Sequence, residues 1–274
     1  MIDSNKKIAV LIDGDNAEAN LIDQILNEAS KFGRVTVKRI YADFTMPQMN
    51  SWKDKLNIHA IRPIQKFAYT KGKNSTDSAM IIDAMDIMHS KTVDGFCIVS
   101  SDSDYTGIAH RVREEGLFVM GIGKSHTPEA FVKACDNFTY TEILAPKHSK
   151  ANRKAEEMQR EEKRPDKKQS PKNIKQQKST AEPKRSGLTN LVTKAPIDID
   201  LVDSAFEMVY DDITGQALAS QLGAALKKVD PTFDIRNYGH SSFRKFLEAL
   251  KPNFDIVSRD DKNGQISVKR GHSG

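Results

Sequence analysis

Residues 96–105, Phe96-Cys-Ile-Val-Ser-Ser-Asp102-Ser-Asp104-Tyr105, give the clearest indication of the fold. Its first four residues are apolar, which is typical of a strand buried on both faces, and the Ser and Asp residues after them favour a turn and a helix cap. In an open parallel sheet, ligands bind beyond the carboxyl ends of the strands. We therefore expect Asp102 and Asp104 to lie at a functional edge of a parallel sheet.

A second predicted strand, Lys7 to Ile12, also ends in acid, with Asp13-Gly-Asp15-Asn16 directly after it. Asp15 or Asn16 is expected to cap the next helix, because short polar side chains accept hydrogen bonds from the first amides of a helix. This helix should end near Gly33. Its apolar residues at helical spacing are Leu21, Ile22, Ile25, Leu26 and Ala29. Two strands would thus deliver acids to one edge of the sheet.

Strands and helices are expected to alternate through the first 144 residues. Further strands are predicted at 35–41, 58–64, 96–99 and 117–122, and helices at 47–56, 75–89 and 104–115. This alternation predicts an α/β fold with a Rossmann-like parallel sheet, helices on both faces and right-handed crossovers.

The helix predicted at 75–89 carries a carboxylate at the head of its apolar stripe. Asp77 precedes Met80 and Ile81 by three and four residues, so its side chain shares their face. A carboxylate aimed at the sheet needs a cation, hydrogen bonds or solvent, although the helix dipole also favours an acid in the first turn. Asp83 and Asp86 fall on other faces and are expected to be solvated charges.

Basic residues are concentrated in the middle of the 274-residue chain, whose formal net charge is +5. Residues 145–194 contain 15 Lys and Arg against 6 Asp and Glu, and no aromatic residue. Such a segment cannot offset its ordering entropy by burial, so a basic, disordered linker is expected there. The predicted domains are therefore residues 1–144 and 195–274.

Periodicity returns in residues 195–274. Three helices are expected around 199–209, 218–229 and 243–250, the last capped at Ser241 or Ser242. Alternating residues at 254–257 and 265–268, with Asn263-Gly264 between them, predict a β-hairpin. Three helices and a hairpin indicate a small winged helix-turn-helix domain.

Nothing in the sequence indicates secretion or a membrane. The first seven residues lack a signal-peptide core, and no apolar run approaches ~18 residues. The two cysteines, Cys97 and Cys135, provide neither a disulfide framework nor a zinc ligand set. A cytoplasmic protein without membrane contact is expected.

The acids at the predicted sheet edge suggest a cation site. Asp13, Asp77, Asp102 and Asp104 offer hard oxygen ligands, with no His or Cys near them in sequence. Such ligands suit Mg²⁺ or Mn²⁺ rather than zinc. Mg²⁺ held by a few carboxylates keeps waters and favours substrates that bring phosphate, such as a nucleic-acid backbone. One ion or two would lower the pKa of attacking water, so no covalent protein nucleophile is required.

These motifs resemble the NYN domain family of PIN-like nucleases. The similar segments are Ile8 to Asn16, Lys71 to Asp77 with Asp83 six residues on, and Ile98 to Tyr105, and the resemblance covers roughly residues 6–144. It implies a Rossmann-like sheet and a Mg²⁺- or Mn²⁺-dependent ribonuclease site. The family's site residues fall on Asp13, Asn16, Asp77, Asp102 and Asp104, whereas Asp15 lies outside the usual pattern.

The C-terminal region resembles the OST-HTH, or LOTUS, domain. The similar stretches are 212–218, 237–243 and Phe246-Leu. This resemblance implies a small winged-helix module that binds RNA or a partner protein. The two resemblances together are much more specific than either one.

A basic loop before the Asp77 helix is a candidate RNA contact. Lys66, Lys71 and Lys73 are interleaved with aromatic residues, a pattern suited to holding phosphates or stacking a base. A mobile solvated loop would have the same composition. Lys124, after the last predicted strand, is a weaker candidate of the same kind.

In the C-terminal region, Tyr238, Gly239 and His240 are the residues expected to face a ligand. His240 taken alone also fits a plain surface histidine. Phe243 and Phe246 stand at helical spacing and are expected in the core.

The leading interpretation is an RNA endonuclease whose N-terminal domain cuts, while the linker and the C-terminal domain hold the substrate. The alternative is a catalytically silent adapter that recruits RNA or a helicase; the complete set of acids favours the enzyme. A third interpretation, Asp13-Gly-Asp15 as the nucleophile motif of a haloacid-dehalogenase phosphatase, fits poorly because the later strand lacks a Gly-Asp pair. The class of RNA, single-stranded DNA as a substrate and the oligomeric state stay open.

Overall fold

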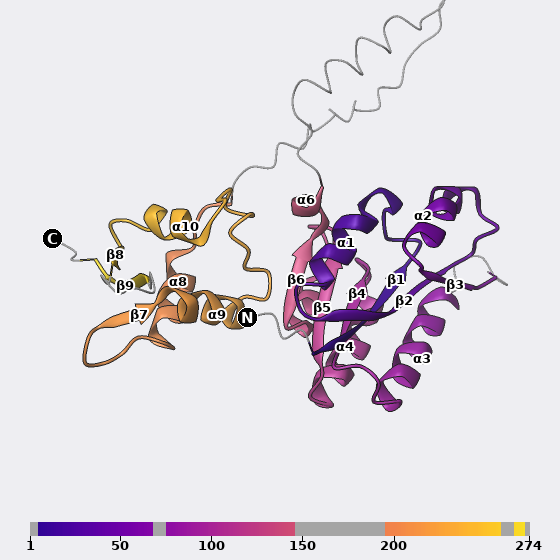
Figure 1. The fold of residues 1–274 in the computed structure, drawn as a ribbon, viewed down its shortest axis with the longest axis horizontal. Coiled ribbons are helices and arrows are strands. Elements are labelled where there is room, and N and C mark those ends of the chain that lie inside the picture. The colour runs from indigo at the N-terminus through magenta and orange to yellow at the C-terminus, as the bar shows by residue number, and fades with distance from the viewer. Residues whose placement is uncertain (1–4, 68–74, 146–194, 259–265, 272–274) are drawn as a thin grey trace, which may run out of the picture. The chain divides into compact units, whose positions relative to one another are not determined.

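The computed structural model describes residues 5–67, 75–145, 195–258 and 266–271 (Figure 1). The N-terminal region, residues 5–145, and the C-terminal region, residues 195–271, each have their own sheet and their own hydrophobic core. Residues 146–194 of the predicted linker, Lys71, Lys73 and the Asn263-Gly264 turn lie outside the described residues.

Six parallel strands form the sheet of the N-terminal region, in the order β3-β2-β1-β4-β5-β6. They are β1 (Lys7–Asp13), β2 (Arg34–Ala42), β3 (Arg62–Gln65), β4 (Gly95–Val99), β5 (Phe118–Gly123) and β6 (Asn137–Tyr140). The strand order reverses between β1 and β4, and ligands bind at such a switch point in open α/β sheets. The predicted parallel α/β sheet is confirmed.

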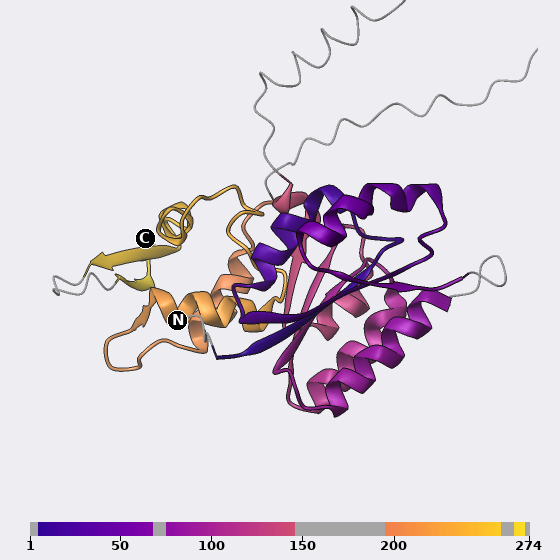
Figure 2. The same ribbon diagram turned by 45° about the vertical axis from the view of Figure 1, so that its right-hand side comes forward.

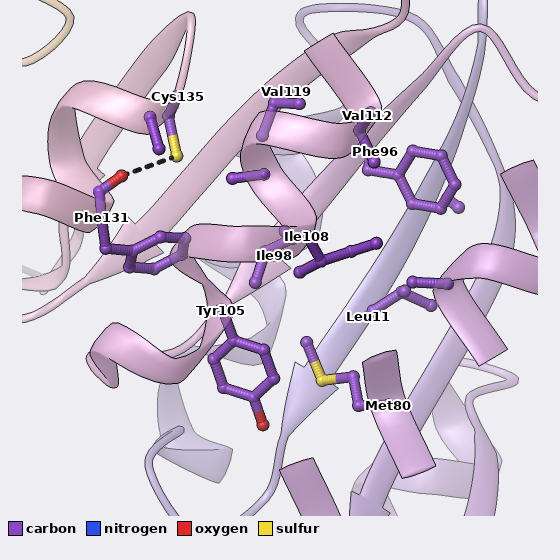
Figure 3. Close-up of a cluster of buried hydrophobic side chains, with 14 of the residues drawn as sticks. Leu11, Met80, Phe96, Ile98, Tyr105, Ile108, Val112, Val119, Phe131 and Cys135 are labelled. Carbon is purple, nitrogen blue, oxygen red and sulfur yellow. Dashed lines mark hydrogen bonds between the residues drawn. The ribbon is translucent and has the colours of Figure 1, made fainter. Parts of the chain in front are cut away.

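Helices cover both faces of this sheet (Figure 2). The helical segments are η1 (Ala19–Leu21), α1 (Ile22–Ala29), η2 (Pro47–Trp52), α2 (Lys53–Ile58), α3 (Ser75–His89), η3 (Ser103–Tyr105), α4 (Thr106–Glu114), α5 (Glu129–Ala134) and α6 (Thr141–Leu144). Because side chains of a strand alternate between faces, β1 contributes to two cores. Ala9 and Leu11 join the core under α3, α4 and α5, which Figure 3 shows in close-up. Val10 joins the other core, with Ile22 of α1.

Three features differ from the prediction: a helix cap, one helix–strand boundary and the number of elements. Neither η1 nor α1 is capped by Asp15 or Asn16, because Asn16 directs its amide to Asp13 instead. The second helix continues to Ile58 and β3 begins only at Arg62, so the strand predicted at 58–64 is shorter. Helices α5 and α6 and strand β6 were not predicted, because these short segments carry no sustained periodicity.

The C-terminal region contains three helices and a three-stranded antiparallel sheet in the order β7-β9-β8. Its elements are α8 (Ile199–Glu207), β7 (Gln216–Leu218), α9 (Ala219–Val229), α10 (Phe243–Ala249), β8 (Phe254–Ser258) and β9 (Ile266–Arg270). Ser242 caps α10 by accepting a hydrogen bond from the Lys245 amide. Phe246 is fully buried, as predicted, and Phe243 packs against the same core. Only β7, three residues long, was not predicted.

Both cysteines are buried free thiols, in agreement with the absence of a disulfide framework. Within the described residues, no helix combines the length and apolar character needed to cross a bilayer.

Candidate metal centre

Three carboxylates meet beyond the carboxyl end of β4, and we call Asp77, Asp102 and Asp104 the acidic cluster. One oxygen of each lies within 4.8 Å of the corresponding oxygens of the other two. Asp77 comes from the first turn of α3, whereas Asp102 and Asp104 come from the turn that leads into η3. The structure thus brings together three of the four acids selected from the sequence.

The turn after β4 holds two of these acids through a helix cap. Asp102 has extended backbone angles and its Oδ1 accepts a hydrogen bond from the Asp104 amide at 3.0 Å. An aspartate that caps in this way leaves its second oxygen available. The short spacing of Asp102 and Asp104 therefore places both carboxylates on one side of the turn, where Asp77 also lies.

Asp13 lies outside the acidic cluster and is 1% exposed. Its Oδ1 accepts a hydrogen bond from the Asp15 amide at 3.1 Å. Its Oδ2 accepts two more, from the Asn16 side-chain amide at 2.6 Å and from the Ser100 hydroxyl at 2.8 Å. Three neutral donors therefore hold this carboxylate in a fixed orientation at the end of β1.

Burial raises the pKa of the Asp13 carboxyl above its ordinary value. The hydrogen bonds from Ser100 and Asn16 oppose this shift, while the nearby charge of Asp77 adds to it. A buried carboxylate normally requires charge compensation or hydrogen bonds. Asp13 receives hydrogen bonds but no ion pair among the described residues, so none of these residues neutralises its negative charge.

Gly14 allows the backbone after β1 to lie in close contact with β2. A Cβ at this position would lie 2.8 Å from the Cβ of Ala42 and 3.0 Å from the carbonyl oxygen of Tyr41. The Gly14 amide donates a hydrogen bond to that carbonyl at 2.9 Å. This close approach fixes the backbone immediately after Asp13.

Ser100 connects the two strand ends, a role not predicted from the sequence. Its hydroxyl donates to Asp13 and accepts a hydrogen bond from the Asp102 amide at 3.1 Å. Ser100 thereby couples the end of β1 to the turn that carries the acidic cluster. The available signal was a serine directly after a fully apolar strand and two residues before Asp102.

Tyr105 is the second residue that sequence analysis missed. Its ring is fully buried against Phe131, with ring centroids 6.4 Å apart, and Figure 3 shows its hydroxyl directed away from the labelled apolar side chains. That hydroxyl donates to Asp77 Oδ1 at 2.7 Å. Burial, together with the charges of Asp13, Asp77 and Asp102, raises the pKa of the Tyr105 phenol far above its ordinary value. Tyr105 is therefore a neutral donor.

Asp83 is not the solvated charge that the helix pattern suggested. It is half-buried and accepts hydrogen bonds from the Arg39 guanidinium and the Tyr41 hydroxyl, both on β2. Arg39 compensates the charge of Asp83, and the contact joins α3 to strand β2 of the sheet. Asp86, in contrast, is exposed as expected.

Two of the basic candidates lie in the described residues. Lys66 is half-buried directly after β3, and its amide donates to the Ala42 carbonyl at 3.0 Å. Lys124 follows β5; its amide donates to the Ser101 hydroxyl at 2.9 Å, and its ammonium lies 3.8 Å from a Glu18 oxygen. Lys124 is therefore held beside the turn after β4.

The C-terminal candidates surround one aromatic residue of the core. The Tyr238 ring lies with its centroid 5.6 Å from that of Phe246, and the His240 ring approaches the same phenylalanine edge-on at 5.8 Å. Gly239 has a φ of 76°, a conformation that favours glycine. Tyr238 and His240 thus contribute apolar contacts, with half-buried rings that retain some exposed surface.

The donor set of the acidic cluster fits a hard divalent cation. All of its ligand atoms are carboxylate oxygens, without a thiolate or imidazole. Oxygen-only sites suit Mg²⁺ or Mn²⁺, whereas zinc sites commonly contain Cys or His. The chemistry of the residues therefore agrees with the cation that the sequence predicts.

Comparison with known proteins identifies both regions. The NYN domain family model matches residues 7–144, and the OST-HTH/LOTUS domain model matches residues 183–266. No curated protein matches the chain. Among solved structures, a protein of unknown function from Vibrio parahaemolyticus is 20% identical with a TM-score of 0.43, covering 51% of this chain and 95% of its own. An uncharacterized protein from Nitrosomonas europaea is 23% identical with a TM-score of 0.28, covering 37% of this chain and 95% of its own. The chain belongs to the NYN domain family of PIN-like proteins and carries an OST-HTH/LOTUS domain in its C-terminal part.

Proposed function

We propose that the chain is a ribonuclease that hydrolyses RNA phosphodiester bonds with the help of Mg²⁺ or Mn²⁺. The observation that supports this most strongly is the acidic cluster at the end of the sheet of an NYN domain. Asp77 and Asp102 accept hydrogen bonds from neutral donors, so these two carboxylates keep the negative charge that attracts a cation.

Asp77, Asp102 and Asp104 are the residues that would hold the ion. Asp13 is a fourth ligand in this proposal, because its Oδ1 accepts only the hydrogen bond from the Asp15 amide among those described and retains acceptor capacity. Asn16 orients Asp13 through its side-chain amide. A bound Mg²⁺ or Mn²⁺ would supply positive charge for the phosphate and lower the pKa of attacking water.

Substrate capture is assigned to basic residues and to the C-terminal domain. Lys66, Lys71, Lys73 and Lys124 would contact phosphates, which gives affinity without sequence preference. The OST-HTH/LOTUS domain would contribute RNA or protein-partner binding, with Tyr238, Gly239 and His240 as the contact residues proposed for it.

The test is a cleavage assay with purified full-length protein and mixed cellular RNA. We expect new RNA ends with Mn²⁺ or Mg²⁺, loss of cleavage in EDTA and recovery on adding either ion back, without a need for Zn²⁺. Mapping the ends gives the cut-site preference, and a parallel reaction with single-stranded DNA tests the sugar preference. Binding of RNA without any cleavage would establish the adapter function instead, and undiminished cleavage in EDTA would indicate a metal-free mechanism.

A further inference from the structure

Asp77 is the member of the acidic cluster that comes from a different element than the other two, so its orientation is not fixed by the turn that carries them. Asp102 and Asp104 share one turn, so their separation is fixed by local backbone geometry. Asp77 comes from α3, a different element. The core holds α3 beside this turn, so a further contact is needed only to fix the rotamer of the Asp77 carboxylate.

Tyr105 provides such a contact from the residue directly after Asp104. Its hydroxyl lies 2.7 Å from Asp77 Oδ1, and its ring is held by full burial and by Phe131. A ring fixed in this way leaves its hydroxyl little freedom to move. One short segment, 102–105, therefore supplies two carboxylates and the donor that orients the third.

The chemistry of the phenol suits an orienting role. The hydroxyl is a neutral O–H group that donates a single hydrogen bond to Asp77 Oδ1. That bond occupies one acceptor position of Asp77 and leaves Oδ2 available. An arginine at this place would neutralise the carboxylate, whereas a neutral donor orients it and preserves its charge.

We infer that Tyr105 is a positioning residue, whose hydroxyl fixes the Asp77 side chain for cation binding by the acidic cluster. This inference rests on the proposed function for its metal-binding consequence. Partners that orient metal ligands typically change metal affinity by about 10- to 100-fold when they are removed.

The chain offers a matched control in Tyr41. Tyr41 is also fully buried and also donates its hydroxyl to an aspartate of α3, in this case Asp83. Asp83 is paired with Arg39 and is not part of the acidic cluster. Tyr105→Phe and Tyr41→Phe each remove one buried hydroxyl from a contact with α3, but only the first removes it from Asp77.

The experiment has two measurements on full-length protein, after thermal melting has established that both variants are folded. The first uses NMR couplings across the Asp77 side chain in metal-free protein, which report whether Asp77 occupies one χ1 rotamer or several. The second uses electron paramagnetic resonance of free Mn²⁺ to measure the dissociation constant of the protein for this ion.

We expect one Asp77 rotamer in the wild-type protein and in Tyr41→Phe, and averaged rotamers in Tyr105→Phe. The Mn²⁺ dissociation constant should rise by about tenfold or more in Tyr105→Phe alone. An averaged Asp77 in the wild type, an unchanged rotamer in Tyr105→Phe, or equal effects of both variants would overturn the inference. If the wild type binds no Mn²⁺ while the rotamers behave as expected, the proposed function fails and the positioning of Asp77 by Tyr105 stands.

Discussion

Two sets of acidic residues, one in each region, have different kinds of neighbours. In the C-terminal region, Arg270 lies 3.3 Å from Asp203 and 2.5 Å from Glu207, and Arg244 lies 3.2 Å from Glu248. In the N-terminal region, the donors to Asp13, Asp77 and Asp102 are hydroxyls and amides. None of the ion pairs among the described residues includes these three aspartates.

Neutral donors combined with clustering distinguish the candidate functional acids, since Asp198 and Asp230 of the C-terminal region also accept hydrogen bonds from neutral donors but belong to no acidic cluster among the described residues. A carboxylate paired with arginine has its charge compensated, and such pairs at a protein surface contribute little to stability. Carboxylates grouped around neutral donors repel one another and remain negative, which is unfavourable unless a cation joins them. Asp83 shows that the distinction also holds within α3, since it pairs with Arg39 while Asp77 on the same helix does not.

The largest expected effect is that of Asp102→Asn. Asparagine keeps the Oδ1 that caps η3 but removes the charge, so cleavage should fall by about a hundredfold or more, as when a charge-stabilising group is removed from an active site. The melting temperature should stay or rise, because repulsion within the acidic cluster decreases. Enzyme kinetics and thermal melting measure the two effects.

Asp203→Asn is the matched control for Asp102→Asn in the C-terminal region. It breaks the exposed pair with Arg270, so stability should change by about 0–1 kcal/mol and cleavage should be unaffected. Near wild-type cleavage by Asp102→Asn, or an equal loss in both variants, would contradict the assignment of separate roles to the two groups of acids.

A smaller effect is expected from ending the chain at Leu144, which removes the basic segment 145–194 and the C-terminal region. An acidic catalytic domain repels RNA except at its cation site, so RNA binding should come largely from segment 145–194 and the C-terminal region. We expect metal-dependent cleavage to persist at high substrate concentration, with weaker RNA binding and a flatter salt dependence. On single strands, every phosphate that the shortened chain no longer neutralises should reduce the slope of log affinity against log salt by about 0.7.

RNA affinity across a salt series, measured for the full-length and shortened chains, decides this point. Equal affinities and slopes would mean that segment 145–194 acts only as a spacer and that the C-terminal region does not hold RNA.

The smallest expected effect concerns the pH dependence of stability in metal-free protein. Burial raises the pKa of Asp13 in the folded state, so the folded protein binds more protons than the unfolded chain between the ordinary and the raised value. The contribution of Asp13 to the free energy of unfolding should therefore fall as pH rises from about 4 through this window. Asp13→Asn should remove this part of the slope.

Urea denaturation at several pH values compares Asp13→Asn with the wild type, and Asp86→Asn on the exposed face of α3 serves as the control. An unchanged slope in Asp13→Asn, or a stability that rises with pH through this window because of Asp13, would show that its charge is compensated in the folded protein.

The elements that bear the acids were predictable because their signals are local. Buried strands such as β4 are apolar runs, and α3 has the predicted bounds, Ser75–His89. Strand β6 was missed because it is short and contains two buried polar residues, Asn137 and Thr139, so it shows no apolar run. The hydrogen bonds at the site could not be predicted from local sequence patterns, because Ser100 and Asp13 are 87 residues apart and Tyr105 and Asp77 are 28 residues apart. Such contacts depend on how strands and helices pack.

Anomalous scattering from Mn²⁺ in crystals of the protein tests the assignment of the acidic cluster most directly. We predict a peak bounded by carboxylate oxygens of Asp77, Asp102 and Asp104, at about 2.0–2.3 Å from the oxygens that bind it. No peak there at an ion concentration that supports cleavage, or a peak beside the arginine-paired acids Asp203 and Glu207 instead, would contradict it.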